Sequence, residues 1–258
     1  MLRLDHRGGM IQDSFLTGFP PFTLTGDGRV IVQGAQIEIF PGPALPAVNV
    51  RRLTEDGIQA VLKEIARTGL FATSIEYRGA QNFVADGADS VFTLHADGED
   101  VEVVIYGLGL LDPSGEYPGI PAAEIAAYGA LARLSDRLTN LDAWLGASMW
   151  ADPSWQTFEP EALRLIVRNA DADLPDDSGI GNALLDWPDG SDPTTFGDPY
   201  NDGAVRCGVV TGQEAADWYQ LLSEANQLTR FAAGDHRYHV TVRPTLPDEP
   251  LECPAPAV

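Results

Sequence analysis

Alternating apolar and polar residues predict short β-strands through the first third of the chain. Apolar runs on both sides of Gly26-Asp27-Gly28 indicate a hairpin over residues 22–32. A second hairpin is predicted across Asp97-Gly98, between 90–95 and 101–106. The same alternation predicts further short strands at 2–6, 37–39 and 47–50.

Helical periodicity follows in two places. Thr54 is suited to begin a helix because its hydroxyl can accept a backbone hydrogen bond, and Gly69 is suited to end it in a left-handed conformation. A longer helix is predicted from Pro121 to about Leu138, because proline favours the first turn and apolar residues recur at helical spacing after it.

Part of this pattern recurs in the second half of the chain. Residues 204–211 align with 47–54, and a second amphipathic helix follows in the same register. Thr211 and Glu214 form a predicted capping box at its start. The alternative is a chance recurrence of a common strand–helix pattern.

A third hairpin is predicted from 229–232 to 236–242, across Gly234-Asp235. Together these patterns predict an α+β fold of two similar units, each an antiparallel β-sheet with hairpins packed against one or two helices. We expect the N-terminal unit to cover 1–147 and the C-terminal unit to cover 148–258.

The two cysteines of the chain are Cys207 and Cys253. They fit one disulfide in an oxidising compartment, or two separate thiols in a reducing one. If the predicted helix runs back along strand 205–210, strand 229–232 is parallel to that strand and strand 236–242 is antiparallel. The tail after the last strand can then fold back to Cys207, so we expect a disulfide.

The chain is strongly acidic, with 38 Asp and Glu against 16 Lys and Arg in 258 residues and a formal charge of -22. Lys63 is its single lysine, which adaptation to salt and a GC-rich genome explain equally well. Nucleic acid and anionic lipid surfaces are excluded as partners because both require a basic face. No apolar run approaches the roughly 20 residues needed for a transmembrane segment.

The segment 171–202 contains nine aspartates and neither lysine nor arginine. Calcium prefers about six to eight oxygen ligands, and these carboxylates supply oxygens in a short stretch of chain. The alternative is a solvated acidic loop in a chain that is acidic everywhere. The candidate calcium ligands are Asp171, Asp173, Asp177, Asp186, Asp189 and Asp192.

Tryptophans supply candidate binding surfaces. Trp150 and Trp155 would either stack on a sugar or peptide, or fill the seam between the two units. Trp187 lies within the acidic segment and is the better exposed candidate. His236 and His239 fall on opposite faces of one predicted strand, which disfavours a transition-metal site there.

Several turns, caps and strand ends resemble those of a family of uncharacterised bacterial proteins, from actinobacterial and Chloroflexi-like sources, that are mostly expected to be secreted or lipid-anchored. The resemblance implies an extracytoplasmic location and carries no catalytic residues with it. The residues that carry it span nearly the whole chain and are 26–31, 53–62, 69–71, 97–107, 206–212, 243–249 and Cys253.

The chain contains no recognisable nucleophile elbow, phosphate loop, dinucleotide fingerprint or zinc-protease motif. We therefore expect a non-enzymatic extracytoplasmic module that binds a protein or cell-envelope ligand, with no cofactor apart from calcium. The alternative is a hydrolase that cleaves envelope glycans with two carboxylates. Met1–Asp5 begins with strand-like alternation instead of a signal peptide, so the extracytoplasmic expectation requires a removed leader, and a cytoplasmic location is the alternative.

Overall fold

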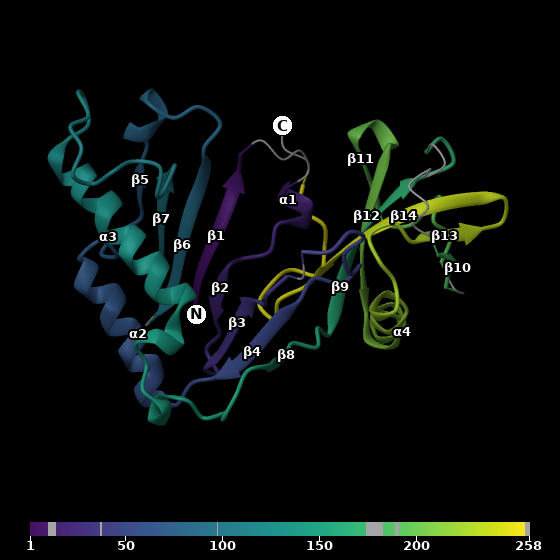
Figure 1. Ribbon diagram of the computed structural model, residues 1–258, viewed down its shortest axis with the longest axis horizontal. Coiled ribbons are helices and arrows are strands. Elements are labelled where there is room, and N and C mark those ends of the chain that lie inside the picture. Colours follow the sequence, from purple (N-terminus) through teal and green to yellow (C-terminus); the bar gives the residue numbers. More distant parts are fainter. Residues whose placement is uncertain (10–13, 37, 97, 174–182, 189–190, 256–258) are drawn as a thin grey trace. The chain divides into compact units, whose positions relative to one another are not determined.

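The computed structural model describes residues 1–9, 14–36, 38–96, 98–173, 183–188 and 191–255. Its helices are α1 (Ser14–Thr17), α2 (Glu55–Thr68), η1 (Gly79–Asn82), α3 (Ala122–Thr139), η2 (Leu141–Ala143), η3 (Ala147–Met149), η4 (Asn201–Gly203) and α4 (Gly212–Ser223) (Figure 1). None of the helices in these ranges combines the length and the apolar character that crossing a bilayer requires.

Contacts between residues divide the chain into two units. The first unit contains 1–14, 18–33 and 48–158, and the second contains 15–17, 34–47 and 159–258. The main change of unit therefore falls after Phe158, later than the predicted boundary after residue 147, and two earlier segments belong to the second unit.

The first unit contains an eight-stranded sheet in the order β5-β7-β6-β1-β2-β3-β4-β8. Its strands are β1 (Leu2–Gly8), β2 (Phe22–Leu24), β3 (Arg29–Gln33), β4 (Val48–Arg52), β5 (Ile75–Tyr77), β6 (Ala88–Ala96), β7 (Glu99–Tyr106) and β8 (Gln156–Thr157). The two predicted hairpins are confirmed, because β2 pairs with β3 and β6 pairs with β7 in antiparallel register.

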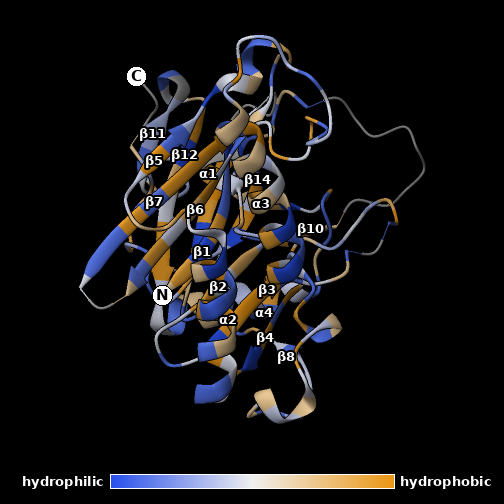
Figure 2. Cartoon of the chain, turned by 90° about the vertical axis from the view of Figure 1, so that its left-hand side faces the viewer, coloured by the Kyte–Doolittle hydropathy of each residue, from blue (hydrophilic) through white to orange (hydrophobic). Residues whose placement is uncertain are grey.

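Helices α2 and α3 lie side by side over one face of this sheet (Figure 1). Their apolar stripes are buried against strand residues of that face, including Leu4, Phe22 and Phe92. Strand β7 is hydrophobic over most of its length and hydrophilic toward Glu99 (Figure 2). Burial of this apolar area is the main driving force that holds the two layers together.

The predicted caps of α2 are confirmed. The Thr54 hydroxyl accepts a hydrogen bond from the Gly57 backbone amide at 3.2 Å, and Gly69 adopts the left-handed conformation with φ of 68°. Glycine is required at position 57 for a different reason, because a Cβ atom there would overlap the carbonyl oxygen of Met149. The same carbonyl accepts hydrogen bonds from the backbone amide and the hydroxyl of Thr54, so α2 begins on a fixed turn.

The second unit contains a six-stranded sheet in the order β10-β13-β14-β9-β12-β11. The predicted third hairpin is confirmed in the antiparallel pair of β13 and β14. Helix α4 buries Ala215, Trp218 and Leu222 on its apolar face, as its periodicity predicts. The strands are β9 (Ala162–Asn169), β10 (Leu184–Asp186), β11 (Asp198–Tyr200), β12 (Val205–Thr211), β13 (Arg230–Ala233) and β14 (His236–Pro244).

The α+β fold class is confirmed, and the sheets are mixed. Each contains one parallel pair among the described strands, β5 with β7 and β10 with β13. The internal repeat receives no support. Strands β4 and β12 each lie next to an edge strand, are antiparallel to both neighbours and are followed by a helix. Their neighbours differ in chain order, however, because β4 lies between β3 and β8, whereas β12 lies between β9 and β11.

Three local predictions are wrong. No strand forms around Ile39, whose side chain is exposed, and residue 37 lies outside the described residues. Thr211 makes no side-chain capping bond, because it still pairs with Ala162 in β12 and the next residue, Gly212, turns the chain with a positive φ.

The third error is the direction of the last two strands. Strand β9 was not predicted and lies between β12 and β14, antiparallel to both. The strand 236–242 is therefore parallel to 205–210, and 229–232 runs antiparallel to it, the reverse of the prediction.

Candidate functional site

An open groove of about 500 Å³ lies along α2 and α3 in the first unit, and we call it the arginine groove. Alanines form much of its α3 wall, and three arginines contribute to its lining. The lining residues are Glu64, Arg67, Thr68, Leu70, Ala123, Ala126, Ala127, Ala130, Arg133, Leu134 and Arg137.

The sequence of α3 explains why a groove forms here. Larger residues of this helix, such as Leu131 and Leu138, are buried in the core of the first unit. Toward α2 the helix presents alanines, of which Ala123 and Ala126 are exposed. Side chains form the ridges of a helix surface, so methyl groups leave a depression along this side of α3.

Ion pairs organise the polar part of the groove. Glu64 pairs with Arg67 one turn later on α2 and with Arg137 of α3, whose Nε lies 2.9 Å from Oε2. The Arg137 guanidinium also lies 4.2 Å from the centroid of the Trp144 ring, a cation–π contact. Glu64 is the single carboxylate in the lining and is shared between two cations.

Arg133 is exposed at the edge of the groove and forms no ion pair with any other described residue. The lining as a whole has three guanidinium groups for one carboxylate. It is thus a local surplus of positive charge in a chain whose formal charge is -22.

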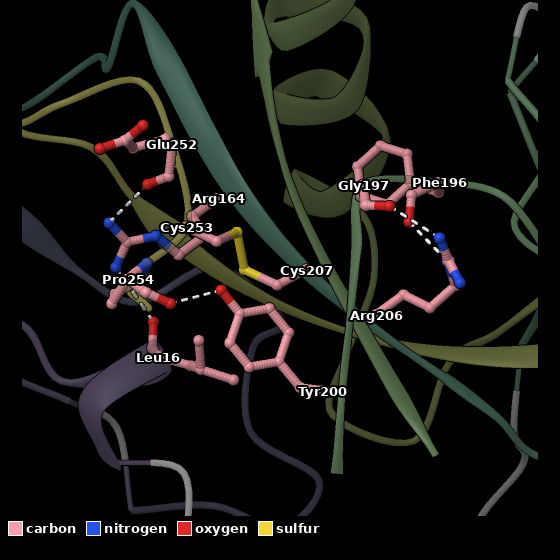
Figure 3. Close-up of a disulfide and its surroundings, with 10 residues drawn as sticks. All are labelled: Leu16, Arg164, Phe196, Gly197, Tyr200, Arg206, Cys207, Glu252, Cys253 and Pro254. Atoms are coloured by element: carbon pink, nitrogen blue, oxygen red, sulfur yellow. Dashed lines mark hydrogen bonds between the residues drawn. A yellow bond between two sulfur atoms is a disulfide. The ribbon is translucent and has the colours of Figure 1, made fainter. Parts of the chain in front are cut away.

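The expected disulfide between Cys207 and Cys253 is present in the second unit, with the two Cα atoms 6.1 Å apart (Figure 3). Cys207 on β12 is completely buried, whereas Cys253 is half-buried. The Tyr200 hydroxyl donates a hydrogen bond to the carbonyl of Pro254, next to the bridge. The bridge and this bond attach the C-terminal tail to the sheet.

Arg164 of β9 supports the same tail from inside the unit. Its guanidinium is buried and donates long hydrogen bonds, both 3.4 Å, to the carbonyls of Leu16 and Glu252 (Figure 3). Burial, with the neighbouring Arg243 guanidinium as a smaller cause, lowers the pKa of Arg164. Arg164 therefore joins α1 and the tail to the central strand.

A glycine lets the chain pass close to the bridge. Gly197 has φ of 54°, and a Cβ atom there would overlap the carbonyl of Cys207. Arg206 secures the same turn, because its guanidinium donates hydrogen bonds of 2.7 Å to the carbonyls of Phe196 and Gly197 (Figure 3). The disulfide thus lies in a tightly constrained part of the sheet.

The first two candidate calcium ligands are engaged by other groups of their own unit. Asp171 accepts a hydrogen bond from the Arg237 backbone amide at 2.7 Å and interacts with the His236 ring at 2.6 Å. These contacts, His236 first, lower the pKa of Asp171 to about 2. Asp173 pairs with Arg168 at 2.8 Å and with Arg230 at 3.1 Å.

The other candidate ligands do not complete a metal site in the part of the chain that the structure describes. Asp192 accepts hydrogen bonds from the amide and hydroxyl of Thr194 in a local turn, and Asp186 ends β10. Asp177 and Asp189 lie outside the described residues. Within those residues, no group of three or more His, Cys, Asp or Glu side chains is arranged to hold a metal ion, and the calcium site stays a prediction.

The prediction that Trp187 is exposed is wrong. Only 7% of it is exposed, and its ring packs edge-on against Trp218 at a centroid distance of 5.0 Å and against Tyr238 at 5.9 Å. Its indole N–H donates to the Ser191 hydroxyl at 3.0 Å, which satisfies its one polar atom. Trp187 is part of the second unit's core.

Trp150 and Trp155 pack against each other at 5.4 Å in the first unit. The Arg51 guanidinium covers the Trp150 ring at 4.1 Å, and the Trp155 indole donates to Asp142 at 2.7 Å. Both rings are therefore engaged with their own unit, and their use as a ligand-stacking surface stays a prediction.

The two neighbouring histidines are used separately. His236 contacts Asp171, whereas His239 Nε2 lies 3.0 Å from the Gln227 carbonyl. Burial is the main cause that lowers the pKa of His239, while the Asp171 carboxylate raises the pKa of His236.

Sequence reasoning did not identify the arginine groove. One signal was present, because Arg133 and Arg137 are four residues apart and share a helix face with Ala126 and Ala130. The opposing wall comes from α2, about 70 residues earlier along the chain, and helix pairing is not visible in local periodicity. Comparisons with models of protein families, with curated proteins and with solved structures found no match for this chain.

Proposed function

We propose that this protein is a non-enzymatic extracytoplasmic module that binds an anionic partner in the arginine groove. The observation that carries the proposal is the convergence of Arg67, Arg133 and Arg137 on one open groove in a strongly acidic chain. Guanidinium groups present planar forks of donors that match carboxylate and phosphate oxygens. Binding of a carboxylate or phosphate group requires only these donors.

The charge of the whole chain does not prevent such binding. At physiological ionic strength the Debye length is about 8 Å, so exposed charges farther away than this are largely screened. Near contact, an anion is affected mostly by the groove's own surplus of positive charge. A partner that carries several negative charges close together gains most from this local surplus.

The chemistry of the groove supports binding over hydrolysis. A glycan hydrolase of the usual kind requires two carboxyl groups about 5–9 Å apart, one of them free to donate a proton. Glu64, the one carboxylate in the lining, is held between Arg67 and Arg137. The groove provides cationic donors instead of an acid–base pair.

The extracytoplasmic location is supported by the Cys207–Cys253 disulfide, because such bonds persist mainly in oxidising compartments. It is also what the family resemblance implies. Intact mass measured directly on protein isolated from its native source, with thiols blocked at lysis, tests the location. A bonded pair is expected, and two blocked thiols would contradict it.

Titration calorimetry with short poly-L-glutamate tests the binding proposal. We expect binding at about 50 mM salt that weakens at least tenfold in Arg133→Glu. Arg237→Glu is the matched control, since Arg237 is an exposed arginine of the second unit and the charge change is the same. The proposal fails if wild type does not bind, or if the two variants bind equally well.

A further inference from the structure

We propose that the partner in the arginine groove is an acidic amphipathic helix of another protein. The inference rests on the proposed function and adds the class of ligand. It follows from three features of the groove: its openness, its length, and the unequal distribution of small and cationic residues along it.

The openness favours a macromolecular partner. Sites for small molecules enclose most of the ligand, typically 70–90% of its surface. The arginine groove is lined by two neighbouring helices, α2 and α3, so a ligand resting in it keeps one side in water. An elongated partner tolerates this exposure when its own outer face is polar.

The residues that line the groove favour one of the common modes of peptide recognition. An added β-strand requires an exposed sheet edge, and a polyproline segment requires an aromatic-lined groove. The arginine groove is lined by α2, α3 and Leu70 just after α2, with alanine, leucine, threonine and charged side chains. A helix that lays its apolar face into a groove is the remaining common mode.

The length of the groove fits a helix of moderate size. Lining residues of α3 extend from Ala123 to Arg137, which corresponds to roughly 20 Å at 1.5 Å per residue. A partner helix of about four turns covers this distance. Ala126 and Ala130 would allow its backbone to approach closely, because small residues reduce the distance between packed helices.

The positions of the positively charged residues along the groove indicate the composition of the partner helix. The alanines lie at 123–130, whereas Arg133 and Arg137 lie at the other end of the α3 wall. Lys63, four residues before Arg67, places a further cation on the same side of α2. A complementary helix carries small apolar residues along its length and clustered Asp or Glu at one end. Three lining arginines are too few for a nucleic-acid backbone, where proteins commonly contact about 6–10 phosphates.

The test uses three synthetic peptides of about 16 residues with the intact protein. The first is amphipathic and helical with clustered glutamates, the second has glutamine in place of glutamate, and the third has the first composition in scrambled order. We expect the first peptide to bind at least tenfold more tightly than either of the others and to gain helicity on binding, measured by calorimetry and circular dichroism.

A variant separates shape from charge. Ala126→Leu places a larger side chain in the groove at an exposed helical position where leucine is well tolerated. It should weaken binding of the amphipathic peptide at least tenfold, whereas Arg237→Glu, which lies outside the groove, should leave that binding unchanged. If the scrambled peptide or a single-stranded oligonucleotide binds as well as the amphipathic peptide, the inference falls. In that case the proposed function still stands if poly-L-glutamate binding depends on Arg133, and it falls too if nothing binds.

Discussion

His236 and Asp171 form an exposed pair whose contribution to stability depends on pH. The Asp171 carboxylate raises the pKa of His236 above its ordinary value of 6.5, so the histidine's contribution is complete below about pH 6.5 and is lost as pH rises through the folded-state pKa. The pKa of Asp171 is lowered from 3.8 to about 2, so its contribution is complete above pH 3.8 and is lost as pH falls toward 2.

We therefore predict that His236→Ala lowers the melting temperature at about pH 5.5 and has a smaller effect at about pH 8.5, because the wild-type histidine loses its charge as pH rises through its folded-state pKa. Thermal unfolding across this range measures the difference. In a background of Asp171→Asn, the same substitution should have little effect at either pH. An equally large effect of His236→Ala at both pH values would contradict the assignment.

Single residues were predicted well where local chemistry decides their conformation. The cap at Thr54 and the left-handed Gly69 depend only on adjacent backbone groups. Trp187 was misjudged because its aspartate-rich neighbours suggested exposure, whereas its environment comes from α4, β13 and β14, which follow it in sequence. Burial of an aromatic ring is decided by such distant partners.

At the scale of elements, strand β14 and the segment after it are joined by a buried ion pair. Arg243 Nη1 and Nη2 lie 2.5 and 2.6 Å from the two carboxylate oxygens of Glu249, and the two side chains are 5% and 9% exposed. The same carboxylate accepts a hydrogen bond from the Leu246 amide at 3.0 Å. Glu249 therefore holds both a buried cation and a turn.

Glu249→Gln should lower the free energy of unfolding by about 3 kcal/mol, because it removes the carboxylate charge that faces the buried Arg243 guanidinium. Urea denaturation measures this loss. The matched control is Glu252→Gln, at an exposed glutamate three residues later, which should change stability by less than about 0.5 kcal/mol. Equal effects of the two substitutions would show that burial of the pair is unimportant.

Hairpins were the elements best predicted, because Gly26-Asp27-Gly28 and the other turns encode them locally. Strand β9 was missed for the opposite reason. It is buried over most of its length, so its apolar residues do not alternate with polar ones, and the buried charge of Arg164 interrupts them. The wrong directions of β13 and β14 relative to β12 followed from that omission.

At the scale of the whole molecule, the disulfide closes a long loop in the unfolded chain. Its cysteines are 46 residues apart in sequence, and the chain-entropy relation assigns a stabilisation of about 4 kcal/mol to a loop of this length. We predict that the double variant Cys207→Ser with Cys253→Ser unfolds at a clearly lower urea concentration than the oxidised protein.

Reduced wild type should match that double variant, which separates the loss of the bond from any effect of serine at these positions. Urea denaturation with and without a thiol reductant makes the comparison. Identical midpoints for oxidised and reduced wild type would contradict the predicted contribution. The disulfide was expected from sequence, although the strand arrangement used to argue for it was wrong.

The division of the chain into two units has a practical consequence for anyone who wishes to separate them. The polypeptide passes from one unit to the other five times, after residues 14, 17, 33, 47 and 158. A gene fragment encoding 159–258 lacks Leu16, which is completely buried beside Cys207, and also lacks Gly42, whose carbonyl accepts a hydrogen bond from the Gln227 amide. Residues 15–17 and 34–47 of the second unit are therefore synthesised long before the strands of its sheet. No single cut in the coding sequence yields either unit whole.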